Sequence, residues 1–135
     1  MSLGPNTWGP IMWNVIHTWA ITYPIEPTDR DRIRAAAYFN NLPNLIPCPS
    51  CGSSFAEILL EYPVEPSLND RFALCEWVNT VHNLVNEKLG KDPVSLETFL
   101  SNYNATLEGG QPRPRITSHV SAWIVKNLYH SAYGT

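Results

Sequence analysis

The fold is decided by residues 69–90, which read NDRFALCEWVNTVHNLVNEKLG. Apolar residues recur in this stretch every three or four positions, at Leu74, Val78, Val81 and Val85. That spacing places them on one face of an α helix. Asn69 or Asp70 can cap the amino end of this helix, and Gly90 is a natural stop at its carboxyl end. One long amphipathic helix is therefore expected here, with its apolar face turned toward a core.

The rest of the chain also follows a helical pattern. We expect a helix from Trp8 to Thr22 with Pro10 in its first turn, where proline is tolerated. A second helix begins at a Thr28 cap. This second helix is expected to close between Pro43 and Pro47, and further helices are expected over residues 49–62 and 95–103. Since no stretch alternates apolar and polar residues in the way a strand does, the predicted fold is all-α. It is a four-helix bundle with a short fifth helix.

The predicted domain organisation is one core followed by a helical extension. Residues 1–107 form the core, and residues 108–117 read as a linker rich in glycine and proline. An additional C-terminal helix is expected within residues 118–135. Its apolar positions are Val120, Trp123, Ile124 and Leu128. We expect this helix to pack on the core or to extend a dimer contact.

Composition excludes several classes of function. The 135 residues carry a net charge of -3, and only 16% of them are charged, so there is no basic surface for nucleic acid. No apolar run approaches the roughly 20 residues of a membrane-spanning helix. The first residues, Met1 to Gly4, lack the charged and apolar regions of a signal peptide. The expected location is therefore cytoplasmic.

The most reactive feature is the sequence Cys48-Pro49-Ser50-Cys51, which stands at an expected helix start. Two thiols at this spacing can form a disulfide or share a metal ion. The helix N-terminus favours the thiolate form, which is the nucleophile in disulfide exchange. The chain has only three cysteines, whereas structural zinc usually takes four ligands arranged in two pairs. A redox pair is the favoured interpretation, with no metal, and Cys75 is expected to be a buried free thiol. A flavin-free dithiol carrier and a zinc-binding helical module stay open as alternatives.

Several short motifs occur together in a fixed order over residues 8–103. They are Trp8-Gly9, Trp13, His17-Thr18, Tyr23-Pro24, Pro47-Cys48-x-x-Cys51, Trp77 and His82-Asn83-x-Val85-Asn86-x-x-Leu89-Gly90-Lys91. In this order they resemble the Erv/ALR family of flavin-linked sulfhydryl oxidases. The resemblance implies a helical bundle that holds FAD at one end and forms a homodimer.

The same resemblance implies a disulfide-forming enzyme. Cys48 would exchange with the substrate, and Cys51 would be the thiolate next to the flavin, which passes electrons to O₂ and yields H₂O₂. Because no further cysteine pair follows Cys75, the electrons are expected to come directly from a thiol-containing protein or from a separate dithiol carrier. Such a compact core resembles the branch found in large cytoplasmic DNA viruses, which implies the host cytoplasm or the virion.

The resemblance also implies a set of residues that bind FAD. His82 would lie at the adenine end, and Lys91 would reach the phosphates or the ribose. His82 and Asn86 are four residues apart, so they share one face of their helix. The complete implied set is Trp8, Gly9, Trp13, His17, Tyr23, Trp77, His82, Asn83, Asn86, Lys88 and Lys91.

Overall fold

The computed structural model describes residues 4–102, and all regular secondary structure in this part of the chain is helical. Its elements are α1 (Pro5–Ile21), α2 (Asp29–Leu45), α3 (Pro49–Glu61), the 3₁₀ turn η1 (Glu65–Ser67), α4 (Arg71–Lys88) and α5 (Leu96–Asn102). The prediction of an all-α fold is confirmed. The predicted linker and C-terminal helix lie outside the described residues.

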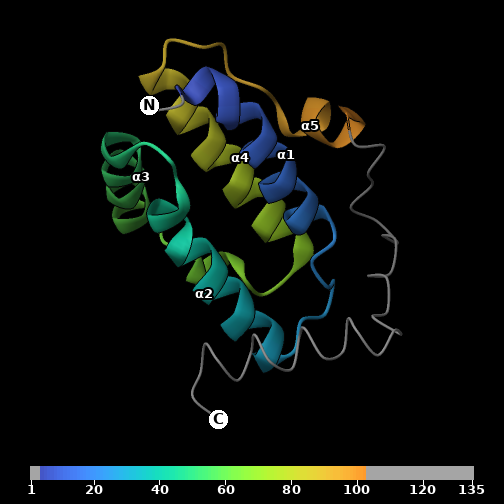
Figure 1. Ribbon diagram of the computed structural model, residues 1–135. Coiled ribbons are helices and arrows are strands. Elements are labelled where there is room, and N and C mark those ends of the chain that lie inside the picture. Colours follow the sequence, from blue (N-terminus) through green and yellow to red (C-terminus); the bar gives the residue numbers. More distant parts are fainter. Residues whose placement is uncertain (1–3, 103–135) are drawn as a thin grey trace, which may run out of the picture.

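The four long helices form the predicted bundle (Figure 1). Helix α1 lies along α4, helix α2 packs against α3, and α3 also contacts α4. The short helix α5 packs against α4. As a result, the start of α1, the start of α3 and the end of α4 meet at one end of the bundle, and the cysteine pair lies at this end.

The helix ends follow from local capping interactions. The Thr28 side chain accepts a hydrogen bond from the Asp31 amide, and the Asp31 carboxylate accepts one in return from the Thr28 amide. Asp70 caps α4 by accepting a hydrogen bond of 2.7 Å from the amide of Ala73. Gly90 follows α4 with a φ of 70°, a left-handed conformation that glycine adopts without strain. These three boundaries agree with the sequence prediction.

The predicted start of α1 was wrong by three residues. The helix begins at Pro5, not Trp8, so Pro10 lies inside it and not in its first turn. Proline is favoured at the first helical position because the amide hydrogen it lacks has no partner there. Pro10 lacks an amide hydrogen farther along, where one backbone hydrogen bond is lost. The early start brings the backbone of Gly9 into the bundle.

The core lies along the apolar stripe of α4. Leu74 and Val78 are fully buried, and Val81 is 1% exposed. Fourth in the stripe, Val85 is only half-buried, although it packs against the core. The core therefore becomes less tightly closed toward the carboxyl end of α4, which is the end that α3 approaches with its cysteines.

Candidate functional site

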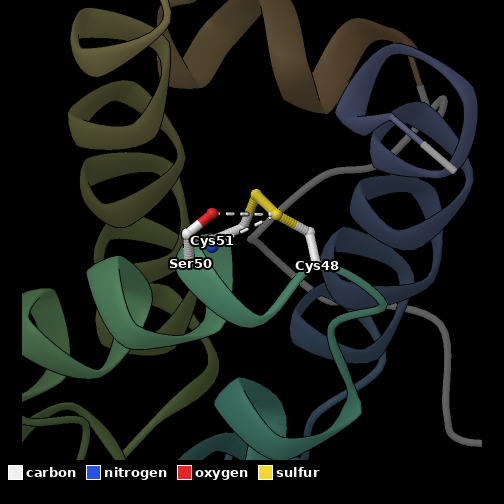
Figure 2. Close-up of a disulfide and its surroundings, with 3 residues drawn as sticks. All are labelled: Cys48, Ser50 and Cys51. Atoms are coloured by element: carbon white, nitrogen blue, oxygen red, sulfur yellow. Dashed lines mark hydrogen bonds between the residues drawn. A yellow bond between two sulfur atoms is a disulfide. The ribbon is translucent and has the colours of Figure 1, made fainter. Parts of the chain in front are cut away.

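Cys48 and Cys51 form a disulfide at the first turn of α3, with their Cα atoms 5.2 Å apart. Cys48 is the N-cap residue, and its sulfur accepts a hydrogen bond of 3.3 Å from the Cys51 amide. The Ser50 hydroxyl lies 3.3 Å from the same sulfur (Figure 2). Pro49 takes the first helical position, so the sequence Cys-Pro-x-Cys itself determines where α3 begins.

This arrangement favours negative charge on sulfur. Unpaired amides at the start of a helix carry a partial positive charge, and one of them already donates to Cys48. A thiolate formed at this position on reduction is therefore stabilised, and thiolate is the form that reacts in disulfide exchange. The third cysteine differs, because burial raises the pKa of Cys75 to about 12 and keeps it a thiol at neutral pH.

One side of the disulfide opens into a largely apolar cavity of about 290 Å³, which we call the disulfide cavity. Residues from α1, α2, α3 and α4 line it. They are Pro5, Trp8, Met12, Trp13, Ile16, Leu42, Ile46, Ser50, Cys51, Ser54, Phe55, Ile58, Val85, Lys88 and Leu89. Cys51 lines this cavity and Cys48 does not. The two sulfurs of one disulfide thus differ in what they can reach, and Cys51 is the one placed beside the cavity.

A second, more polar cavity of about 390 Å³ lies between α1, α4 and α5, and we call it the histidine cavity. Its lining residues are Pro5, Trp8, Gly9, Pro10, Trp13, Asn14, His17, Asn79, His82, Val85, Asn86, Leu89, Lys91, Asp92, Val94, Phe99 and Asn102. Five residues line both cavities, namely Pro5, Trp8, Trp13, Val85 and Leu89. The two cavities are therefore adjacent and share an aromatic and aliphatic wall.

Two histidines form the polar centre of the histidine cavity. His17 Nε2 and His82 Nδ1 are 2.7 Å apart, joined by a hydrogen bond in which one ring donates and the other accepts. The Trp13 ring stacks on His82 with 3.9 Å between centroids and 6° between planes. The ring of Phe99 lies 3.9 Å from that of His17. Burial and the neighbouring His82 lower the pKa of His17 to about 3, and burial together with Lys91 lowers that of His82 to about 4. Both imidazoles are neutral at physiological pH.

The surroundings of Gly9 indicate that this region has room for a ligand. The residue is buried and lines the histidine cavity, yet a Cβ built on it would meet no atom within 4 Å. A buried glycine with open space at its Cβ position leaves room for another molecule to approach the backbone. Together with flat aromatic walls and amide groups, this space fits a large, planar, polar cofactor such as the flavin nucleotide that the resemblance implies.

The Asn83 side chain binds the backbone of the loop that follows α4. Its amide nitrogen donates to the carbonyl of Val94 at 2.8 Å, and its amide oxygen accepts from the Val94 amide at 2.9 Å. The side-chain amide of Asn86 donates to the same oxygen at 3.3 Å. The backbone carbonyl of Asn86 accepts a hydrogen bond from the backbone amide of Lys91. These bonds hold residues 89–94 against α4, where Leu89, Lys91 and Val94 line the histidine cavity. Asn83 itself lines neither of the two cavities.

The two lysines of the predicted set lie at different cavities. Lys88 lines the disulfide cavity and donates a hydrogen bond of 2.8 Å to the hydroxyl of Ser54. Lys91 lines the histidine cavity. Both side chains are exposed, so each ammonium group can reach an anionic ligand without first being desolvated.

Two predicted cofactor residues, Tyr23 and Trp77, line neither cavity. The Tyr23 hydroxyl donates to the carbonyl of Leu68, and its own carbonyl accepts from Arg71. The Trp77 indole donates to the carbonyl of Tyr62 at 2.9 Å. Both aromatic side chains therefore fasten the connection between α3 and α4. The sequence could not separate them from Trp8 and Trp13, because buried aromatic residues look alike in a pattern.

One cavity residue and one packing residue beside the cysteine pair were missed by the sequence prediction. Asn79 lines the histidine cavity, and its position three and seven residues before His82 and Asn86 was a usable signal of a shared helix face. Gly52 is buried at the contact of α3 with α2, where an added Cβ would lie 2.5 Å from the carbonyl oxygen of Pro43. A glycine inside a helix is locally unfavourable, and that cost was the available signal.

The described part of the chain shows neither a metal site nor a membrane-spanning helix. Within residues 4–102, no group of three or more His, Cys, Asp or Glu side chains could hold a metal ion. None of the helices in the same range is long and apolar enough to cross a bilayer.

Comparison with protein families gives one match that covers most of the chain. A model of the Erv1 / Alr family matches residues 10–104. A relative in Acanthamoeba polyphaga mimivirus, described as a probable FAD-linked sulfhydryl oxidase, is 35% identical over 57 residues, which are 42% of this chain and 40% of that protein. A protein of Invertebrate iridescent virus 6 is 37% identical over 49 residues, which are 36% of this chain and 44% of that protein. The matched region thus spans less than half the length of each of these two viral relatives.

Comparison with solved structures identifies the same fold. The yeast Erv1 core superposes with a TM-score of 0.69 at 25% identity, covering 76% of this chain and 86% of that one. The FAD binding domain of Erv1 from Saccharomyces cerevisiae gives a TM-score of 0.69 at 26% identity, covering 75% of this chain and 94% of that one.

Proposed function

Because the chain belongs to the Erv1/Alr family, we propose that it is an FAD-dependent sulfhydryl oxidase that forms disulfides in substrate thiols. Electrons would leave the substrate through Cys48 and Cys51 and reach O₂, giving H₂O₂. The observation that supports this proposal most directly is that the two cysteines of the disulfide have different surroundings. Cys51 lines a cavity that adjoins a polar, histidine-containing one, whereas Cys48 lies at the cap of its helix outside that cavity.

The residues that would hold FAD are those that line the two cavities. The disulfide cavity offers apolar walls beside Cys51 for the flavin ring, and the histidine cavity offers His82 and Trp13 for the adenine end. Lys91 would pair with the phosphates. Asn83 would act by holding the loop that carries Lys91. When bound, FAD accepts two electrons from a thiolate and returns them to O₂, which a cysteine pair alone does not readily do.

The thiol chemistry follows from the position of the two sulfurs. A substrate thiolate attacks the sulfur of Cys48, the Cys48–Cys51 bond breaks, and Cys51 leaves as a thiolate at the start of α3. A second substrate thiolate then attacks the substrate's own sulfur in the mixed disulfide. The substrate leaves oxidised, and both cysteines are reduced. The helix N-terminus stabilises the thiolates formed in both steps.

The first experiment is the visible spectrum of the purified protein, before and after a small dithiol is added in air. A flavin band that bleaches and then recovers as oxygen is consumed supports the oxidase. A colourless protein that FAD cannot reconstitute would remove this proposal in favour of a flavin-free dithiol carrier or a zinc-binding module.

A matched pair of glycine variants tests where the cofactor binds. Gly9→Ala places a methyl group in the open space of the histidine cavity, so FAD affinity should fall by at least about tenfold, or about 1.4 kcal/mol. The stability of the FAD-free protein should not decrease, because the methyl group meets no protein atom. Gly4→Ala is the control, since Gly4 belongs to the same helix end but lines neither cavity. Equal FAD affinity in the two variants contradicts the assignment of this cavity.

We further propose that the protein is a homodimer that associates through α1. Ile11, Val15 and Trp19 recur every four residues along this helix and are 65%, 41% and 42% exposed. The Trp19 ring lies 3.6 Å from that of Tyr38 on α2, so the apolar face extends from one helix to the other. An exposed apolar stripe of this kind is typical of an interface.

Sedimentation of a Val15→Asp variant tests the dimer. The variant should sediment as a monomer, because a carboxylate buried in an apolar contact has no partner. The Leu60→Asp variant is the control, since Leu60 is 86% exposed but lies on α3. A dimer that survives Val15→Asp rules out this face.

The remaining proposals concern the source of electrons and the cellular location. We propose a thiol-containing protein or a separate dithiol carrier as the substrate, since the one further cysteine, Cys75, is buried and stays protonated. Both of the relatives named above are viral proteins, which supports the host cytoplasm or the virion as the place of action.

A further inference from the structure

The chain segment that contains the disulfide has no charged side chains. Between Arg34 and Glu57 the chain contains no Asp, Glu, Lys, Arg or His. This interval includes the second half of α2, the connection to α3 and the first turns of α3, and therefore all residues next to the reactive cysteines in sequence. Charged residues make up 16% of the whole chain, so a neutral interval of this length is a distinct feature.

Apolar side chains are exposed within this neutral interval. Leu45, the last residue of α2, is 56% exposed. Pro47 and Pro49, on either side of Cys48, are exposed as well. Leu45 is three residues from Cys48, so their Cα atoms are within about 10 Å of each other. One ammonium group reaches the first turns of α3 from another helix, since Lys88 on α4 donates a hydrogen bond to the hydroxyl of Ser54, one turn after Cys51.

The reaction itself determines what must cover this surface. In a mixed disulfide the two Cα atoms lie within about 4.4–6.8 Å of each other. The residues that flank a substrate cysteine are therefore brought against the residues that flank Cys48. This step rests on the oxidase function proposed above, because it requires a polypeptide thiol to attack Cys48.

We propose that Leu45, Pro47 and Pro49 form a docking surface for an uncharged, apolar segment on either side of the reactive cysteine of a protein substrate. A leucine or valine in that segment removes the exposed Leu45 side chain from water, which favours binding. A charged side chain at the same place loses water and finds no opposite charge within the neutral interval, which disfavours binding. The protein thereby selects among thiol proteins by the side chains next to the cysteine.

Electrons and protons balance as in the proposed function. The substrate thiolate forms a bond to the Cys48 sulfur as the Cys48–Cys51 bond breaks. The second substrate thiol loses its proton to solvent and displaces Cys48. The substrate loses two electrons and two protons, and the two electrons reside on the reduced cysteine pair. Docking changes the rate of the first of these steps, and the chemistry of the later ones is unchanged.

The test compares a small dithiol with peptides that differ only beside their cysteines. Dithiothreitol and three dicysteine peptides, with leucine, aspartate or lysine flanks, are oxidised by the FAD-loaded full chain, and kcat/KM is measured for each. The leucine peptide should exceed both charged peptides by roughly five- to tenfold, as expected for one partly exposed leucine that becomes buried. Equal kcat/KM for the three peptides overturns the docking surface.

Charge variants at Leu45 locate the contact and separate it from general damage. In Leu45→Asp, the ratio of kcat/KM for the leucine peptide to that for dithiothreitol should fall by about the same five- to tenfold. In Leu45→Lys, the aspartate peptide should become the preferred charged peptide, and in Leu45→Asp the lysine peptide should, because opposite charges attract across the new contact. Damage to the fold does not produce this exchange of preference.

Leu60→Asp is the matched control. Leu60 is a more exposed leucine on the opposite end of α3, so its replacement should leave every peptide ratio as in the unchanged chain. An equal effect of the Leu45 and Leu60 variants overturns the proposal. Failure of the chain to oxidise dithiothreitol contradicts the oxidase function itself, whereas oxidation of dithiothreitol without peptide preference contradicts only the docking surface.

Discussion

Acidification should destabilise the protein through the hydrogen-bonded pair of His17 and His82. Burial is the main cause that lowers their pKa values in the folded protein, to about 3 and about 4. In the unfolded chain each imidazole has a pKa of about 6.5. A base with a lowered folded-state pKa binds fewer protons than the unfolded chain does. The free energy of unfolding is therefore complete above about pH 6.5 and decreases as the pH falls toward 4.

The size of the effect follows from these values. At pH 5 the unfolded chain holds a proton on nearly every histidine, while the folded pair holds almost none. Each histidine then lowers the free energy of unfolding by about 2 kcal/mol, and the pair by about 4 kcal/mol if the two titrate independently. His82 is only half-buried, so water screens part of its contribution, and we expect a total of about 2–3 kcal/mol. For a domain of this size, that loss lowers Tm by on the order of 10 °C.

Thermal unfolding of the FAD-free protein, followed by circular dichroism between pH 7.5 and 5, measures this loss. The control is the double variant His17→Gln with His82→Gln, which should be less stable at pH 7.5 and lose less stability on acidification. His119 and His130 are present in both proteins, so the comparison isolates His17 and His82. The same dependence on pH in both proteins would refute the assignment of the effect to this pair.

Three further perturbations test the site. Cys51→Ser should retain FAD and lose turnover, whereas Cys48→Ser should lose turnover and show the long-wavelength absorption of a thiolate beside oxidised flavin. Asn83→Ala removes both hydrogen bonds to Val94, so the loop that lines the histidine cavity should loosen and the Kd for FAD, measured by fluorescence titration, should rise about tenfold, or about 1.4 kcal/mol. Gly52→Ala should lower the free energy of unfolding in urea by about 1–3 kcal/mol, because its Cβ would lie 2.5 Å from a carbonyl oxygen of α2.

Each of these expectations has a contrary outcome. Normal turnover in Cys51→Ser removes the assignment of the inner cysteine, and a long-wavelength band in that variant reverses the order of the two sulfurs. Unchanged FAD affinity in Asn83→Ala, with lowered thermal stability, limits Asn83 to a role in folding. An unaltered urea midpoint in Gly52→Ala means that α3 moves away from α2 at no cost.

The helices could be predicted because their signals are local. Thr28 and Asp70 cap through side chains that reach only three residues ahead, and Gly90 stops α4 by its own backbone conformation. The start of α1 escaped prediction because two prolines, Pro5 and Pro10, both suit a first turn. Which one occupies it depends on how deeply the helix packs into the bundle, and that is not a local property.

The site could be predicted only in part, since it depends on contacts between distant segments. His82 and Asn86 were proposed from the family resemblance, and their shared helix face agrees with their both lining the histidine cavity. The roles of Tyr23 and Trp77 were not separable from those of the cavity aromatics, because hydrophobicity does not tell a cavity wall from a core. The hydrogen bond between His17 and His82 joins residues 65 positions apart, and no pattern within either helix contains it.

Trp13 connects the two halves of the site. Its ring stacks on His82, and its centroid also lies 6.3 Å from that of Phe55, with 64° between the two ring planes. Phe55 lies one turn after Cys51 in α3 and lines the disulfide cavity. A change in the charge or position of His82 therefore reaches the surroundings of Cys51 through two side chains. Protonation of the pair should for this reason disturb both cavities together, so that acid loosens the hold on FAD and slows thiol oxidation over the same range of pH.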